Sequence, residues 1–157
     1  MDRLLTWPVV LETLLEGEDL AIRQAEWAMA QIVSGRATEA QMGGFLIALR
    51  SKGVVAEELV GFRDAVLEAA RSKRMPIGLL SDIDPLHWAW VCRHHPWIPA
   101  SVDSISVSFE SGWLKPDRAA YRHALTPLEV PAEHCLFVDD RPKNVQGARR
   151  FGMRALH

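Results

Sequence analysis

The chain has 157 residues, 48% hydrophobic and 24% charged, with a formal net charge of −2, which is typical of a folded protein of one domain or two small ones. It has no basic half or stripe for nucleic-acid binding and no apolar run long enough to span a membrane. Its start lacks the pattern of a signal peptide, and Cys92 and Cys135 are far apart, so we expect a cytoplasmic protein without disulfides or a zinc site.

The first seventy residues are predicted to form four helices. Apolar residues recur at helical spacing in each of them, and Gly17, Gly35 and Gly53 end the first three. Thr6 is expected to cap the first helix, and Thr38 with Gln41 has the pattern of a capping box at the start of the third. An all-helical bundle follows. Its apolar stripes are Leu11, Leu14 and Leu15; Ala21, Ala25, Ala28, Met29 and Ile32; Met42, Phe45, Leu46 and Leu49; and Leu59, Phe62, Val66 and Ala69.

This helical segment resembles the N-terminal domain of anthranilate phosphoribosyltransferase. The resemblance is carried by Thr-Trp-Pro at 6–8, Ala-Glu-Trp-Ala-Met at 25–29 and the run QMGGFLIALRSKG at 41–53. In that family the domain builds the dimer interface and one wall of a cleft, so the resemblance implies a homodimer through residues 5–70. The glycine-rich loop of the family's catalytic domain does not occur in this sequence, so phosphoribosyl transfer is not expected.

The rest of the chain alternates short apolar runs with helical patterns. Strands are predicted near 77–81, 104–109, 135–138 and 153–156. Asp84, followed by Pro85, has the pattern of a helix N-cap. The helix that it starts is rich in Trp and His, which invites a metal or ligand site. Since His94 and His95 are adjacent rather than one turn apart, a helix packed on a sheet is the preferred interpretation.

Three segments in this second half contain candidate functional residues. The first predicted strand ends at Ser81 and Asp82, a loop holds Lys115 before Pro116, and the third strand ends in Asp139 and Asp140. The carboxyl ends of parallel strands are where open α/β sheets bind ligands. Adjacent carboxylates there need compensation by a cation, hydrogen bonds or water, and Mg²⁺, which prefers oxygen ligands, would supply it. The alternative is a capped helix that follows a solvated acidic turn.

These segments resemble the second, third and fourth motifs of the haloacid dehalogenase superfamily, a phosphatase-rich group of Mg²⁺-dependent hydrolases. The resemblance implies that Ser81 and Lys115 bind a transferring phosphoryl group. It also implies that Asp139 and Asp140 hold Mg²⁺, and that the substrate is a phosphorylated small molecule.

The first motif of that superfamily is absent. It is a strand that ends in Asp-x-Asp, supplies the nucleophile and lies between the strands of the second and fourth motifs. Without it, the two flanking strands close up, a strand of another chain fills the slot, or this half is less compact than its relatives. Asp82 of the Asp82-Ile83-Asp84 run is one replacement nucleophile, although Asp84 already has a structural role as a cap.

The predicted fold is α/β: a helical bundle over residues 1–72, then a truncated three-layer, Rossmann-like parallel sheet over 73–157. Two functions stay open. One is a Mg²⁺-dependent phosphohydrolase with the helices as a dimerisation or cap domain, its activity in doubt because the nucleophile is missing. The alternative is a non-catalytic binding or assembly module, natural or an artificial chimera, that dimerises through the bundle. Metal-dependent turnover would distinguish them.

Overall fold

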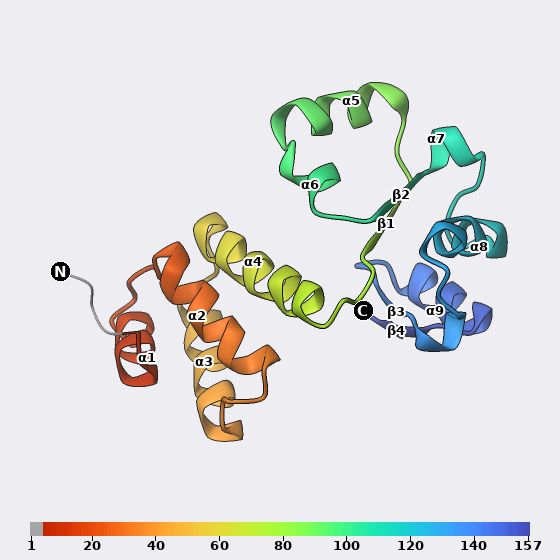
Figure 1. The fold of residues 1–157 in the computed structure, drawn as a ribbon. Helices are drawn as coiled ribbons and strands as arrows, with labels where there is room; N and C mark the ends of the chain where they lie inside the picture. The colour runs from red at the N-terminus through yellow and green to blue at the C-terminus, as the bar shows by residue number, and fades with distance from the viewer. Residues whose placement is uncertain (1–4) are drawn as a thin grey trace. The chain divides into compact units, whose positions relative to one another are not determined.

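The computed structural model describes residues 5–157; the first four residues of the predicted 1–72 domain lie outside this range. The described chain forms two compact units, of which the first ends at Met75 and the second begins at Pro76. The first unit is helical and the second contains all the described strands (Figure 1). The predicted α/β class is therefore confirmed, and each unit is described by itself below.

The first unit consists of four helices. They are α1 (Trp7–Leu15), α2 (Ile22–Val33), α3 (Glu39–Lys52) and α4 (Ala56–Ser72). The predicted capping box starts α3: Gln41 N donates to Thr38 Oγ1 at 3.2 Å, and Thr38 N donates to Gln41 Oε1 at 2.9 Å. Thr6 is the N-cap residue of α1, as predicted, but its side chain makes no capping hydrogen bond. Pro8 in the first turn reduces the number of backbone donors that need a cap there.

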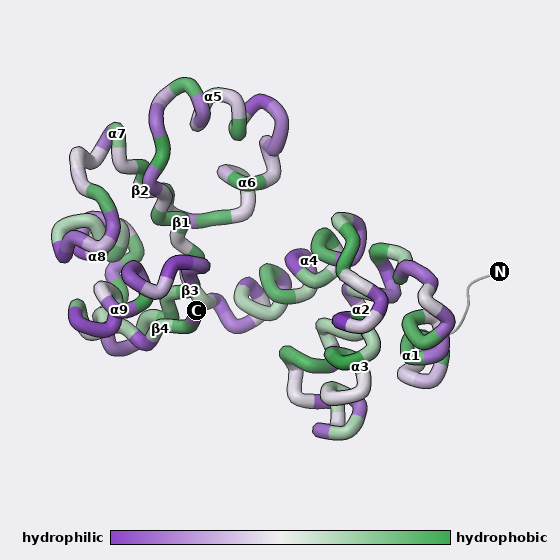
Figure 2. Tube along the Cα trace, turned by 180° about the vertical axis from the view of Figure 1, so that it is seen from behind, coloured by the Kyte–Doolittle hydropathy of each residue, from purple (hydrophilic) through white to green (hydrophobic). Residues whose placement is uncertain are grey.

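The core of this unit is built around aromatic rings. Trp7 lies 5.4 Å from Trp27 and 5.9 Å from Phe45, and Phe45 lies 5.9 Å from Phe62, all centroid to centroid in edge-to-face geometry. Phe45 is fully buried. In Figure 2 part of the α3 tube is green, the colour of hydrophobic residues. Burying rings of this size contributes most of the stability that a small bundle can gain.

Gly61 allows α4 to approach α2 closely. A Cβ atom at this position would clash with the carbonyl oxygen of Ile22 and would lie 2.7 Å from the backbone N of Glu26. Backbone atoms cannot give way as a flexible side chain does, so Gly61→Ala is expected to destabilise the bundle by about 3 kcal/mol. Thermal or urea unfolding followed by circular dichroism measures this loss.

Gly43 provides the matched control, because a Cβ there would meet nothing within 4 Å. It lies in α3, so Gly43→Ala should stabilise the bundle by about 0.5–1 kcal/mol through helix propensity alone. Equal effects of the two substitutions would show that α2 and α4 do not pack as closely as described.

The second unit alternates strands and helices. Its elements are β1 (Gly78–Ser81), α5 (Pro85–His94), α6 (Trp97–Ala100), β2 (Ser104–Val107), α7 (Ser108–Ser111), α8 (Arg118–Leu125), η1 (Thr126–Leu128), η2 (Ala132–His134), β3 (Leu136–Val138), α9 (Pro142–Phe151) and β4 (Arg154–Leu156). The four predicted strands are all present within one or two residues of their predicted bounds. The second ends early, since α7 begins at Ser108.

The strands form two separate parallel pairs rather than one sheet. β1 pairs with β2, with Leu80 opposite Ser106, and β3 pairs with β4, with Phe137 opposite Ala155. Within residues 5–157, no ladder joins β1 to β3. Of the outcomes that the missing motif left open, closure of the two flanking strands against each other is therefore wrong for the described chain.

Tyr121 of α8 lies at the centre of the core of the second unit. Its ring packs edge to face on Phe137 with 5.5 Å between the centroids, and Leu80 of β1 contacts the same cluster. The Tyr121 hydroxyl donates to the carbonyl of Asn144 at 2.7 Å, which ties α8 to α9. Burial, assisted by the charges of Asp139 and Asp82, raises the pKa of Tyr121 to about 12. One helix thus supports both strand pairs.

The helix predicted to pack on the sheet does not do so. Neither α5 nor α6 contains a buried residue, and Trp90 and Trp97 are exposed. Trp90 instead stacks on His94 within α5, with ring centroids 4.5 Å apart. The sequence pattern predicted this helix correctly, but the described chain offers no surface that buries one of its faces.

Candidate functional site

The candidate site lies where β1 and β3 end. Ser81 is the last residue of β1, Asp139 follows β3, and Lys115 comes from the loop between α7 and α8. These are the carboxyl ends of parallel strands, as the sequence predicted. The structure brings Asp82, Lys115 and Asp139 together through hydrogen bonds.

Lys115 connects the two strand pairs. Its ammonium Nζ donates to the carbonyl of Leu80 at 3.0 Å and to Asp139 Oδ2 at 2.8 Å. It also lies 5.9 Å from the ring centroid of Phe137. The Lys115 and Asp139 side chains are only 11% and 6% exposed, so this ion pair is largely shielded from solvent. A shielded pair with good geometry is strongly coupled, because removing either partner leaves a buried charge.

Every oxygen of the Asp139 carboxylate has a partner. Oδ2 accepts from Lys115, and Oδ1 accepts from Arg141 N and from Asn144 Nδ2, both at 2.9 Å. Burial by itself raises the pKa of Asp139, but the hydrogen bonds from Lys115, Arg141 and Asn144 outweigh it and hold the pKa below its usual value. Asp139 is therefore a charged carboxylate that the fold itself compensates.

This depressed pKa predicts acid sensitivity of the second unit. An Asp that is more acidic when folded contributes stability above its unfolded pKa of about 3.9, and this contribution is lost as pH falls through the folded value. We expect the urea midpoint of the α8 and α9 amide signals to be level near neutral pH and to fall below about pH 4. Asp139→Asn should flatten that fall; an unchanged profile would contradict the role given to Asp139.

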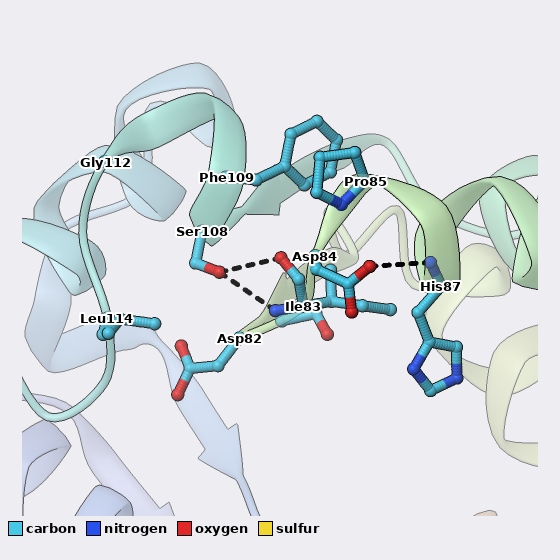
Figure 3. Close-up of a pocket in the computed structure, with 10 residues that line it drawn as sticks. Asp82, Ile83, Asp84, Pro85, His87, Ser108, Phe109, Gly112 and Leu114 are labelled. Carbon is cyan, nitrogen blue, oxygen red and sulfur yellow. Dashed lines mark hydrogen bonds between the residues drawn. The ribbon is translucent and has the colours of Figure 1, made fainter.

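Ser81 and Asp82 line an open pocket of about 710 Å³. In Figure 3 the Asp82 carboxylate extends toward the side of Leu114, away from the Ser108 hydrogen bonds. Asp82 Oδ1 accepts from the backbone N of Lys115 at 3.0 Å. Asp82 is thus held beside the Lys115 loop.

Ser108 is a pocket residue that sequence reasoning missed. Its hydroxyl accepts from Ile83 N at 2.9 Å and donates to Ile83 O at 3.0 Å, which fixes the turn after β1 (Figure 3). Ser104, Ser106 and Ser108 alternate with apolar residues in the strand predicted at 104–109, and Ser104 and Ser106 are buried. Ser106 Oγ instead lies 2.9 Å from His123 Nδ1 of α8. The alternating serines are the signal that could have pointed to Ser108.

The N-terminus of α5 is already occupied by its own cap. Asp84 Oδ1 accepts from Leu86 N and His87 N, both at 3.0 Å, as the cap prediction required. Those hydrogen bonds lower the pKa of Asp84. The first backbone donors of this helix therefore bind a carboxylate of the chain itself.

The predicted Mg²⁺ ligands, Asp139 and Asp140, differ in their surroundings. Residues 5–157 contain no group of three or more His, Cys, Asp or Glu side chains that could hold a metal ion. Asp139 is paired with Lys115, and Asp140 is exposed. One buried acceptor, Asn144 Oδ1, has no hydrogen-bond partner, but its amide nitrogen already faces Asp139. The residues present therefore fit an ammonium better than a divalent cation.

Sequence comparison identifies the first unit. Residues 8–70 match the family model of the glycosyl transferase family, helical bundle domain. Anthranilate phosphoribosyltransferase of Clavibacter michiganensis is 54% identical over 65 residues, which are 41% of this chain and 18% of that protein. The Nocardioides enzyme of the same name is 49% identical over 78 residues, 50% of this chain and 23% of that protein. The chain thus spans less than a quarter of the length of these curated relatives.

Structure comparison concerns the fold. A HAD family enzyme from Bacteroides thetaiotaomicron, solved in complex with magnesium and inorganic phosphate, matches with a TM-score of 0.54 and 17% identity, over 99% of this chain and 86% of that one. An uncharacterized protein from Corynebacterium glutamicum matches with a TM-score of 0.57 and 28% identity, over 66% of this chain and 74% of that one. No helix within residues 5–157 is both long and apolar enough to cross a bilayer. Residues 8–70 are similar in sequence to the glycosyl transferase family, helical bundle domain, and the chain is similar in fold to HAD-family enzymes.

Proposed function

We propose that the second unit binds inorganic phosphate, or the phosphate group of a small molecule, and that this chain alone does not hydrolyse it. The proposal is carried by the position of Lys115, whose ammonium lies between the ends of β1 and β3. Ser81 lines the adjacent open pocket and offers a hydroxyl donor. A fixed cation beside a hydroxyl is a suitable pair for a phosphate oxygen.

Turnover needs a nucleophile in line with the phosphorus atom. In the described site, Asp82 and Asp139 already accept hydrogen bonds from other groups. Asp82 is the only candidate that the sequence offered, and its Oδ1 is held by the Lys115 backbone. Asp139 is engaged by three donors. The HAD-like fold supports a hydrolase ancestry, and the Bacteroides enzyme of that fold was solved with magnesium and phosphate. To bind Mg²⁺, Asp139 would first have to exchange one of these hydrogen-bond donors for the metal.

Titration of inorganic phosphate into the full chain, followed by amide NMR, tests the binding. We expect saturable shifts at Ser81, Asp82 and Lys115. The Ser81→Ala variant should bind about tenfold more weakly, the equivalent of one lost hydrogen bond to a charged group. Ser51→Ala, at an exposed serine of α3, is the control and should bind normally.

Two results would refute phosphate binding at this site. One is the absence of saturable shifts with or without Mg²⁺. The other is equal affinity in the Ser81→Ala and Ser51→Ala variants. If saturable shifts appear only with Mg²⁺, the site binds the metal despite the Lys115–Asp139 pair. Phosphate binding at this site would then be supported, but binding of phosphate without metal would be refuted.

We also propose that the first unit forms a homodimer. The observation that favours this is a set of exposed apolar side chains on α3, of which Ile47 is 73% and Leu46 52% exposed. Contiguous exposed apolar residues of this kind mark association surfaces. Sedimentation of the unmodified chain should show a dimer, and Ile47→Lys should shift it to monomer. A monomeric unmodified chain at micromolar concentration would refute the proposal.

A further inference from the structure

The pocket at the end of β1 is larger than a phosphate group requires. Its volume is about 710 Å³, which lies within the range of about 300–1,000 Å³ found for pockets that hold small organic ligands. Inorganic phosphate fills only a small part of such a space. The residues that line the rest of the pocket therefore indicate what a phosphorylated ligand carries beside its phosphate.

The lining of this pocket has a polar end and an apolar wall. Ser81 and Asp82 form the polar end, where Asp82 Oδ1 accepts from the backbone N of Lys115 at 3.0 Å. The apolar wall comes from the turn after β1 and from the segment that follows β2. Its side chains are those of Ile83, Pro85, Phe109 and Leu114. A ligand with its phosphate at the polar end thus meets an apolar surface beyond it.

Other polar groups of the lining are already held by the chain. Asp84 Oδ1 accepts from Leu86 N and His87 N, both at 3.0 Å. The ring of His87 packs edge to face on Trp90, with 6.1 Å between the centroids. These contacts leave the negative charge of Asp84 at the pocket, and with Asp82 it would repel a second anionic group on a ligand.

Phe109 is the aromatic side chain of the apolar wall. It is 38% exposed, and within residues 5–157 its ring contacts no other aromatic ring. The rings of Tyr121 and Phe137 in the core, by contrast, pack on each other. A free ring at a pocket wall favours a second ring, because an aromatic pair gains more than the burial of its apolar area alone.

Ser108 fixes Phe109 relative to the polar end. Ser81 lies opposite Val107 in the ladder of β1 and β2. Ser108 Oγ then binds both backbone groups of Ile83, at 2.9 and 3.0 Å, and Phe109 follows Ser108 directly in α7. In Figure 3 the Phe109 ring and the Ser81 end of the turn are joined through these two bonds. The wall is therefore ordered before a ligand arrives, which lowers the entropic cost of binding.

We infer that the ligand of this pocket is a phosphate monoester of an aromatic alcohol, with its phosphate at Ser81 and its ring against Phe109. The ring carries no further anionic group, because of the charges of Asp82 and Asp84. This inference rests on the proposed phosphate binding, and it names the class of ligand for the same site.

Three ligands test the inference on the full chain by amide NMR: phenyl phosphate, cyclohexyl phosphate and inorganic phosphate. We expect phenyl phosphate to bind at least about tenfold more tightly than inorganic phosphate, because its ring buries apolar area. It should bind about threefold more tightly than cyclohexyl phosphate, whose ring has a similar size but no π face. Nuclear Overhauser effects should connect the phenyl protons with the Phe109 ring. A carboxylate on the phenyl ring should weaken binding.

Phe109 offers a matched pair of variants. Phe109→Leu keeps an apolar side chain but removes the ring, and Phe109→Tyr keeps the ring. We expect Phe109→Leu to lose the preference for phenyl over cyclohexyl phosphate and Phe109→Tyr to retain it. The ratio of the two affinities is measured within one variant, so a small change in stability does not affect the comparison.

Two outcomes would overturn the inference while the proposed function stands, provided that inorganic phosphate gives saturable shifts. One is equal affinity of the unmodified chain for phenyl and cyclohexyl phosphate. The other is an unchanged phenyl preference in Phe109→Leu, which would place the ring elsewhere. If none of the three ligands gives saturable shifts, the proposed function and the inference are both refuted.

Discussion

Replacing Lys115 by methionine is expected to destabilise the second unit by about 3 kcal/mol, because the change leaves the carboxylate of Asp139 buried without its cation. The Leu80 carbonyl also loses the donor that reaches it from the loop. Urea unfolding followed by the amide signals of α8 and α9 measures the loss. Signals of α1 to α4 serve as an internal reference, since the first unit has its own core.

The double variant Lys115→Met with Asp139→Asn separates ionic coupling from packing. If the pair is coupled, the double variant should be at least about 1 kcal/mol more stable than the sum of the single effects predicts. Strict additivity would mean that Lys115 stabilises the unit only through its aliphatic stem. The role given to the Lys115–Asp139 pair would then be wrong.

Replacing Glu58 by glutamine should have an effect of similar size in the first unit. Glu58 is fully buried: Oε1 accepts from Leu20 N at 3.0 Å, and Oε2 accepts from Val55 N at 3.0 Å and from Lys52 Nζ at 3.2 Å. An amide would place donors against some of these donors and would remove the charge opposite Lys52. We expect a loss of about 3 kcal/mol in chemical unfolding of the bundle.

Lys52 shows how strongly this cluster favours charge. Burial by itself lowers its pKa, yet the hydrogen bonds to Asp19 and Glu58 outweigh burial and raise the pKa. Glu57→Gln is the matched control, since Glu57 is an exposed neighbour in the first turn of the same helix and its loss should cost no more than about 0.5 kcal/mol. Similar losses for Glu57→Gln and Glu58→Gln would contradict the structural role of Glu58.

Local sequence signals predicted the elements of this chain well. Thr38 and Gln41 predicted the start of α3, and Asp84 before Pro85 predicted the start of α5. Short apolar runs predicted all four strands of the second unit. These signals act within a few residues of the structure that they specify, so they can be read without knowing the fold.

The contacts between these elements were harder to predict from the sequence. The strand at 104–109 was predicted, but the contact of the buried Ser106 with His123 of α8 was not, because no local pattern connects these two residues. The helix after Pro85 was predicted correctly but not its lack of a buried face, because that depends on a surface that the described chain does not supply. The separation of β1 from β3 was anticipated only as one of several outcomes of the missing strand.

For the candidate site too, the sequence predicted the residues but not their contacts. The sequence motifs assigned Ser81, Asp82, Lys115 and Asp139 to one predicted site. They could not show that Asp139 is saturated by Lys115, Arg141 and Asn144, because this depends on loop geometry.

The most direct test of phosphate binding without turnover is hydrolysis of a generic aryl phosphate by the full chain, with and without Mg²⁺, beside its Asp82→Asn and Asp139→Asn variants. We predict that the unmodified chain releases no more phenolate than the variants do in either condition. Mg²⁺-dependent turnover that both substitutions abolish would contradict this account, and would mean that Asp82 serves as a nucleophile despite its bond to the Lys115 backbone.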